Sequence, residues 1–175
     1  VFSPYAPTWT GRASTAFVPD FFPRRIVGWR TMSKMPTELP LDALEMALWI
    51  RDRAGEDVTG VIQHSDAGSQ YTALRYAERL ADVGAIASID TVGDAFEIAL
   101  AKTVIGLYKT ECVKIDGPFR NADDLELATL SWVHWFNENR LHSSIDYLTP
   151  IEKENEYYRE INSQRQPAPG ELALH

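Results

Sequence analysis

Two kinds of hydrophobic spacing alternate along this chain, and the alternation constrains the fold more than any other feature of the sequence. Near the start, two apolar and β-branched segments, Ser14–Val18 and Arg25–Arg30, flank a stretch that contains Pro19, Asp20 and Pro23. This pattern is typical of a β-hairpin, because the turn-forming residues lie between two strand-like runs. A short edge strand is expected before it, at residues 5–9.

After the hairpin, segments with helical spacing alternate with short apolar runs. The predicted helices cover residues 37–55, 71–83, 94–112 and 121–139, and the predicted strands cover residues 58–63 and 85–89. The run at 58–63 has the composition of a buried parallel strand. Strands that alternate with helices after a hairpin predict an α/β fold, in which helices cover both faces of a mixed sheet.

The length of 175 residues suits one domain, which we place at residues 1–160, followed by a flexible tail at 161–175. A composition of 45% hydrophobic and 24% charged residues excludes general disorder, and the sequence contains no membrane span or signal peptide. A soluble, cytoplasmic protein is therefore expected. The single cysteine, Cys112, and the scattered histidines do not have zinc-site spacing. The first residue is Val1 rather than Met, which suggests a fragment.

The net charge of −8 argues against a nucleic-acid partner, because affinity for phosphate comes mainly from Lys and Arg. Its distribution is uneven, since residues 1–37 carry a net +4 and the remainder carries −12. The basic opening is therefore a candidate DNA-facing surface. The alternative is that both regions are ordinary solvated surfaces.

A polar segment, His64-Ser65-Asp66-Ala67-Gly68-Ser69-Gln70-Tyr71, follows the strand predicted at 58–63. Sites gather at the carboxyl ends of strands in open α/β sheets, so Asp66 is well placed to hold a metal ion. The competing interpretation is that Asp66 closes a turn with Gly68 and caps the next helix.

Four segments in order, this one included, resemble the catalytic core of bacterial insertion-sequence transposases, a family of the retroviral-integrase type. The others are Tyr5 to Trp9 with the hairpin 16–29, Gly93-Asp94 with Ala99-Leu100-Ala101 and Lys109-Thr110-Glu111, and Trp135-Phe136-Asn137 with Arg140, His142 and Tyr147-Leu148-Thr149-Pro150. The resemblance implies a ribonuclease-H-like fold with a mixed central sheet of about five strands, the first three antiparallel, flanked by helices. It also implies that Asp66 lies near Phe2, just past a central strand.

In this family two aspartates and a glutamate hold two divalent ions, Mg²⁺ or Mn²⁺, that cut and join phosphodiester bonds. The resemblance places the second aspartate at Asp66. The family spacing of thirty-five intervening residues then puts the glutamate position at Lys102, and the first aspartate position falls on Phe2. Only Asp66 of the triad is a carboxylate, so we expect weak metal binding or none. We also expect the Lys102 amine to approach Asp66 within about 4 Å in place of the metal.

Another carboxylate would have to replace the missing ligands if the chain were active. Helical spacing turns Glu97 and Glu111 away from Lys102, whereas Asp20 and Asp94 remain open as substitutes.

The resemblance also nominates DNA-contacting residues: Lys109, Lys102, Arg24, Arg25, Arg140 and His142. Each has a plainer alternative. The two lysines share one helical stripe and can be solvated, whereas Arg140 and His142 can complement the end of a helix dipole next to Trp135 and Phe136.

Three functions are consistent with these sequence features. The first is a transposase core that binds transposon ends and target DNA, with strand transfer impaired. The second is a non-catalytic DNA-binding or interaction domain that pairs with itself or with an intact transposase, and the third is an active nuclease with an unusual ligand set. In each case the expected location is the bacterial cytoplasm, at the nucleoid, with no membrane partner.

Overall fold

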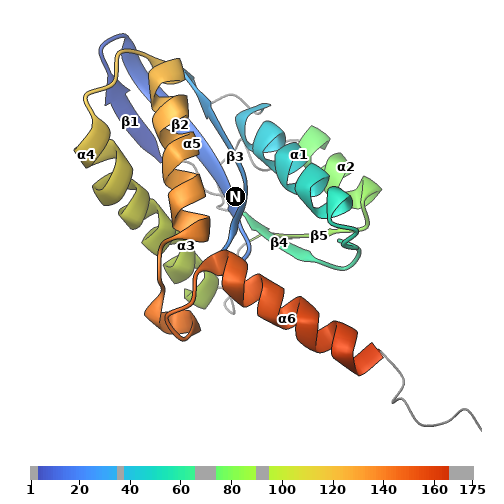
Figure 1. Ribbon diagram of the computed structural model, residues 1–175. Helices are drawn as coiled ribbons and strands as arrows, with labels where there is room; N and C mark the ends of the chain where they lie inside the picture. Colours follow the sequence, from blue (N-terminus) through green and yellow to red (C-terminus); the bar gives the residue numbers. More distant parts are fainter. Residues whose placement is uncertain (1–3, 35–37, 66–73, 90–94, 166–175) are drawn as a thin grey trace, which may run out of the picture.

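Strands and helices follow the predicted order in the computed structural model of the chain, which describes residues 4–34, 38–65, 74–89 and 95–165 (Figure 1). Three strands form an antiparallel sheet in the order β1-β2-β3, namely β1 (Tyr5–Thr8), β2 (Gly11–Pro19) and β3 (Ile26–Met32). The hairpin and the edge strand are thus confirmed. The backbone N–H of Asp20 donates to the carbonyl of Arg25 at 2.7 Å, which closes the turn between β2 and β3.

Two further strands, β4 (Ile62–Ser65) and β5 (Ile86–Ile89), pair in parallel, as the sequence predicts. The five expected strands, antiparallel and parallel pairs together, are thus all present, and the ladders of the described residues join them as a group of three and a group of two. Two backbone hydrogen bonds join the segments that lead into β4 and β5. The Gly60 N–H donates to the Gly84 carbonyl, and the Ile86 N–H donates to the Val61 carbonyl.

The expected burial of the 58–63 segment is wrong. Val61 and Ile62 are 50% and 54% exposed, and regular pairing starts only at Ile62. Because the parallel pair has no further strand neighbour among the described residues, its open side leaves these apolar side chains partly in solvent.

The helices account for most of the remaining chain. Their bounds are α1 (Glu38–Arg53), α2 (Leu74–Asp82), α3 (Ala95–Tyr108), the π-helical turn η2 (Lys109–Val113), α4 (Lys114–Asp116), α5 (Ala122–Glu138), the 3-10 turn η3 (Ser143–Ile145) and α6 (Pro150–Arg165). The predicted helix at 94–112 therefore continues through η2 into α4. Helix α6 was not predicted, and it runs past the expected tail boundary, so residues 161–165 are helical. None of the helices in the described ranges is both long and apolar enough to cross a bilayer.

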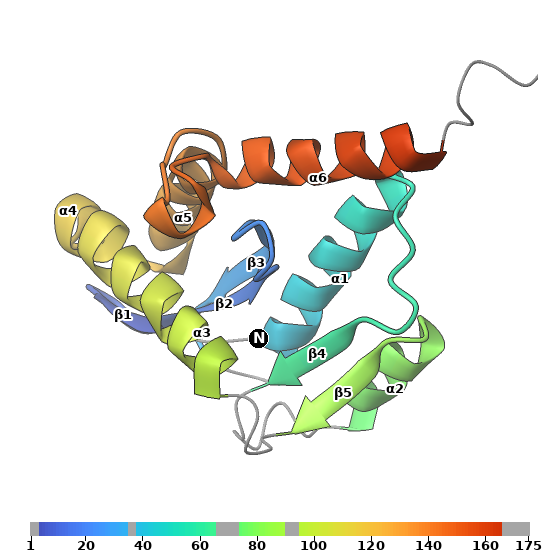
Figure 2. The same cartoon turned by 90° about the horizontal axis from the view of Figure 1, so that it is seen from below.

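Two hydrophobic cores occupy the two faces of the three-stranded sheet (Figure 2). Successive side chains of β2 point to opposite faces, so Phe17 packs with α3 and α5 while Ala16 and Val18 pack with α1 and α2. Helices therefore cover both faces, as expected. On the first face, Phe17 lies edge-on to Tyr108 and Trp132, with ring centroids 4.9 and 5.9 Å apart.

A chain of buried hydroxyl groups fixes α3 and α5 against the sheet. The Tyr108 hydroxyl lies 3.2 Å from Thr15 Oγ1 on β2 and 2.8 Å from Thr129 Oγ1 on α5. On the opposite face, α1 approaches β3 closely at Gly28, where a Cβ atom would lie 2.1 Å from the Ala43 carbonyl oxygen. These contacts hold α1, α3 and α5 in fixed positions around the hairpin.

Candidate nucleic-acid interface

The rod formed by α3, η2 and α4 carries the two lysines nominated as DNA contacts. Lys102 lies on α3 and Lys109 opens η2, and both are exposed. Seven residues separate them, so they project from similar sides of the helix. Neither lysine forms an ion pair with another residue of the described ranges.

A second cationic side chain joins Lys109 at the sheet edge. The Lys109 amine lies 5.7 Å from the ring centroid of Tyr5, and the Arg12 guanidinium carbon lies 4.9 Å from the same centroid. Tyr5 is 54% exposed, which leaves this group open to solvent. We call Tyr5, Arg12 and Lys109 the Tyr5 cluster. It combines two positive charges with an aromatic face, as nucleic-acid surfaces often do.

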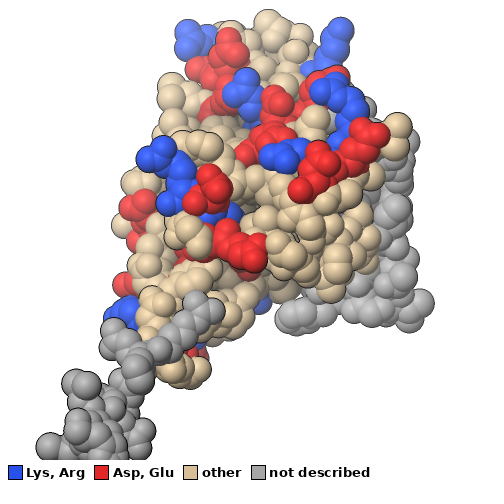
Figure 3. Space-filling model, turned by 90° about the vertical axis from the view of Figure 1, so that its right-hand side faces the viewer, with Lys and Arg blue, Asp and Glu red and all other residues tan. Residues whose placement is uncertain are grey.

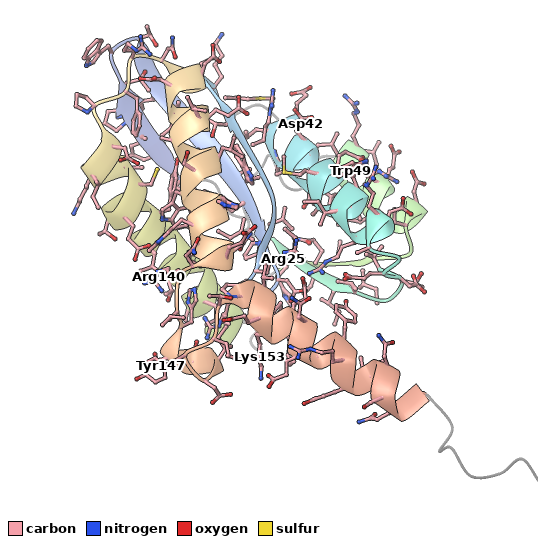
Figure 4. The ribbon with its side chains drawn as sticks, viewed as in Figure 1. Arg25, Asp42, Trp49, Arg140, Tyr147 and Lys153 are labelled. Atoms are coloured by element: carbon pink, nitrogen blue, oxygen red, sulfur yellow. The ribbon has the colours of Figure 1, made fainter. Side chains whose placement is uncertain are left out.

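Two other basic residues of the first 37 pair with carboxylates of the fold. Arg30 pairs with Asp42 of α1 and Glu126 of α5, and Arg25 pairs with Glu154 of α6. Arg25 and Asp42 are labelled in Figure 4. Arg24 adopts a left-handed backbone conformation, and burial lowers its pKa. Acidic and basic side chains are also interspersed on the face shown in Figure 3. The net +4 of the opening therefore does not form one continuous basic surface.

Arg140 is engaged by a carboxylate. Its Nε and Nη2 atoms donate to Glu111 Oε1 at 3.0 and 2.9 Å, and the Trp132 indole N–H donates to Glu111 Oε2 at 3.3 Å. This arrangement joins η2 to the end of α5. It satisfies the guanidinium largely inside the protein, which favours a structural role for Arg140.

His142 lies directly beside this pair and is only 8% exposed. Its Nδ1 atom is 3.3 Å from Arg140 Nη1, and its ring is 4.7 Å from that of Phe136. Burial, followed by the charges of Arg140 and Arg24, lowers the pKa of His142 from 6.5 to about 4. A neutral imidazole adds no positive charge for a phosphate group at neutral pH.

We expect an NMR titration of His142 to give a pKa near 4 and no transition near 6.5. Because the unfolded chain takes up this proton first, the contribution of His142 to the free energy of unfolding should fall as the pH drops from about 6.5 toward 4. Substitution Arg140→Gln should raise the pKa by removing a neighbouring cation. A wild-type transition near 6.5 would contradict the buried placement.

The family of the chain follows from comparison with known proteins. Residues 2–95 match a family model described as Integrase core domain, and residues 86–150 match a second model with the same description. This chain belongs to the integrase core domain family. The predicted resemblance to insertion-sequence transposases is confirmed by its relatives.

Two curated relatives show the resemblance to insertion-sequence transposases. The chain is 48% identical over 168 residues to a putative transposase for insertion sequence element IS986/IS6110 of Mycobacterium tuberculosis, covering 95% of the chain and 59% of the relative. It is 42% identical over 159 residues to a transposase for insertion sequence element IS629 of Shigella sonnei, covering 91% and 52%. The chain thus spans between about half and three fifths of the length of these integrase-core proteins.

Solved structures share the fold at low identity. The magnesium complex of the HTLV-2 integrase catalytic core domain in its trimeric form aligns with a TM-score of 0.59 at 11% identity, covering 86% of this chain and 90% of that one. The BIV integrase catalytic core domain aligns with a TM-score of 0.59 at 16% identity, covering 94% and 96%. The ribonuclease-H-like fold expected for an integrase core is therefore confirmed.

Of the three catalytic positions that the resemblance assigns, two fall outside the described residues. Phe2 and Asp66 both lie there, so the expected proximity of Asp66 to Phe2 and to Lys102 stays a prediction. The three positions supply one carboxylate, one phenyl ring and one ammonium group. This donor set does not fit two divalent ions, because Mg²⁺ requires hard oxygen ligands. Within the described ranges, no group of three His, Cys, Asp or Glu side chains is arranged to hold a metal.

The acids considered as replacements have other partners or no described position. Asp20 accepts from Arg51 Nη2 at 2.8 Å and from the Phe22 backbone N–H at 3.0 Å. Glu111 is held by Arg140, and Asp94 lies outside the described residues. The side-chain position of Glu97 is not described either. Asp20 and Glu111 are therefore each already paired with an arginine.

The sequence reasoning missed a buried charge cluster centred on Arg51. Nη1 of Arg51 donates to Glu56 and Glu154 at 2.6 Å each, and its Nη2 donates to Asp20. Arg51 occupies the apolar stripe of α1, four residues after Ala47 and seven after Leu44. A charged residue on that stripe was the available signal, because it must find partners once it is buried.

Proposed function

We propose that this chain is a transposase-type integrase core that binds DNA through the face of α3 and η2 and does not catalyse strand transfer. The single observation that carries the proposal is Lys102, an exposed cation on α3 at the position that the family resemblance assigns to the catalytic glutamate. An ammonium group repels divalent cations and attracts phosphate. One substitution therefore disfavours metal binding and favours DNA contact.

The neighbouring residues support DNA as the partner. The Tyr5 cluster places two further cations on the same side of the sheet edge as η2. With a net charge of −8, the whole chain repels DNA at long range, so local contacts must supply the affinity. We expect this binding to be weak and strongly dependent on salt. Transposon ends and target DNA are the proposed ligands.

The Lys102→Ala, Lys109→Ala double variant is expected to bind duplex DNA more weakly than the unaltered chain. If each amine meets one phosphate, the slope of log K against log salt should become shallower by about 2. Fluorescence anisotropy of a labelled duplex at several salt concentrations measures both quantities. Because both lysines are exposed, the variant should unfold at the same temperature as the unaltered chain.

Arg53→Ala is the matched control. Arg53 is exposed on α1, which packs on the face of the three-stranded sheet opposite α3. Its removal should change the salt slope less than the removal of either nominated lysine. Equal losses for Arg53 and the two lysines would indicate a general charge effect and would contradict this DNA-binding face.

A second copy of the chain is the other proposed partner. The HTLV-2 integrase core has been solved in trimeric and dimeric forms, and α5 of this chain exposes Leu127 and Leu130. Exposed leucines one turn apart are typical of a helix that packs against another surface. Light scattering after size exclusion should give a mass above 19.7 kDa, and Leu127→Glu should restore the monomer. A monomeric unaltered chain would contradict this assignment.

A further inference from the structure

A cavity of about 470 Å³ lies between the hairpin turn, α1, the β4–β5 pair and α6, away from the Tyr5 cluster. Its volume is within the range of small-molecule pockets, about 300–1,000 Å³. Most of the wall is apolar, from Val18, Val27, Leu44, Leu48, Val61 and Leu80. Every residue that lines it belongs to the described part of the chain.

One wall of this cavity is charged. It includes Asp20, Arg51 and Glu56, together with Tyr158 of α6. The Arg51 guanidinium already donates to Asp20, Glu56 and Glu154, so these carboxylates balance its positive charge. Glu154 also binds Arg25. Three carboxylates therefore face two guanidinium groups, which leaves one negative charge in excess.

Asp20 is the carboxylate best able to receive a further donor. Its side chain is 38% exposed, whereas Glu56 and Glu154 are more deeply covered. It accepts one hydrogen bond at each oxygen, from Phe22 and from Arg51. A carboxylate offers about four acceptor sites, so Asp20 retains capacity for a ligand N–H.

We propose that this cavity binds a small organic amine, with its apolar body against the Val18, Leu44 and Leu80 side and its ammonium group at Asp20. The apolar walls select a hydrophobic body, and the excess negative charge selects a cation over an anion. Phosphate and nucleic acid are disfavoured for the same reason. The site is therefore separate from the proposed DNA-binding face.

The test uses 4-phenylbutylamine as the probe, with 4-phenylbutan-1-ol and 4-phenylbutyrate as neutral and anionic analogues of similar shape. Binding is followed in ¹H–¹⁵N NMR spectra of the whole chain. We expect the amine to shift the amides of Val27, Ile62 and Ala85 and to bind about tenfold or more tightly than the alcohol, with the butyrate weakest.

Three variants test whether the amine binds in this cavity. Asp20→Asn should weaken amine binding by about tenfold, whereas Asp42→Asn, which alters an exposed acid of α1 that pairs with Arg30, should leave it unchanged. Val61→Trp should block the cavity from its half-exposed rim without disturbing the core. Thermal unfolding checks that each variant is folded, and Val61→Trp keeps the test valid if Asp20→Asn is not.

The proposal is overturned if the alcohol or the butyrate binds as tightly as the amine. It is equally overturned if the amide shifts lie outside the cavity, or if Val61→Trp binds the amine as well as the unaltered chain does. Loss of DNA binding in the lysine variants with retained amine binding would separate this site from the proposed function.

Discussion

The unaltered chain is expected to show no binding of Mn²⁺ and no Mg²⁺- or Mn²⁺-dependent DNA cleavage or joining. The double variant Phe2→Asp, Lys102→Glu, which restores three carboxylates with Asp66, is expected to bind Mn²⁺ on the order of a hundredfold more tightly or better. The reason is a change of local charge, because an ammonium and a phenyl group are replaced by two anionic oxygen ligands. Calorimetric titration measures the affinity for Mn²⁺ directly and does not require catalytic activity.

Two controls make the result specific to the catalytic positions. Lys114→Glu reproduces the charge change of Lys102→Glu elsewhere on the rod and should not create tight Mn²⁺ binding. Adding Asp66→Asn to the double variant should abolish the restored site. Metal-dependent activity in the unaltered chain that disappears with Asp66→Asn would show that another acid completes the ligand set, and Asp20 and Asp94 would be the first to test.

The hairpin and the alternating elements could be predicted because their signals are local. Proline and Asp20 mark the turn between β2 and β3, and leucines at helical spacing mark α1 and α5. The two-faced core also follows from the alternation of Ala16 and Phe17 along β2. These features depend on neighbours within a few residues, which the sequence displays directly.

The pairing of distant segments could not be predicted in the same way. Nothing local in Glu154 indicates that it meets Arg25 and Arg51, which lie more than one hundred residues earlier. Likewise, the exposure of Val61 and Ile62 depends on how β4 is covered by other elements rather than on its own apolar composition. The engagement of Arg140 by Glu111 is a third case, because the nominated residue has an internal partner on another helix.

Substitution Arg51→Met is expected to lower the free energy of unfolding by about 3–5 kcal/mol at pH 7.5, the cost of removing one partner from a buried ion cluster. Methionine fills much of the same space, but it leaves Glu154, Glu56 and Asp20 without the guanidinium that each of them contacts. Glu154 keeps Arg25, but the three carboxylates then repel one another with only that one guanidinium left to balance them. Denaturant unfolding, followed by circular dichroism, measures the loss.

The pH dependence distinguishes this cause from simple loss of packing. Burial already raises the pKa of Asp20 against the lowering effects of Arg51 and of the Phe22 backbone hydrogen bond, and removal of Arg51 takes away the larger of these two. Carboxyl groups whose folded pKa exceeds the unfolded value stabilise the protein at low pH, and that stability is lost as the pH rises through the folded pKa. The deficit of Arg51→Met should therefore shrink between pH 7.5 and pH 5. Arg53→Met, which removes an exposed arginine stacked on Trp49 of the same helix, should cost less than about 1 kcal/mol at either pH. A deficit for Arg51→Met that is the same at both pH values would assign the effect to packing, because the carboxylates are the groups in contact with Arg51 that titrate towards this range.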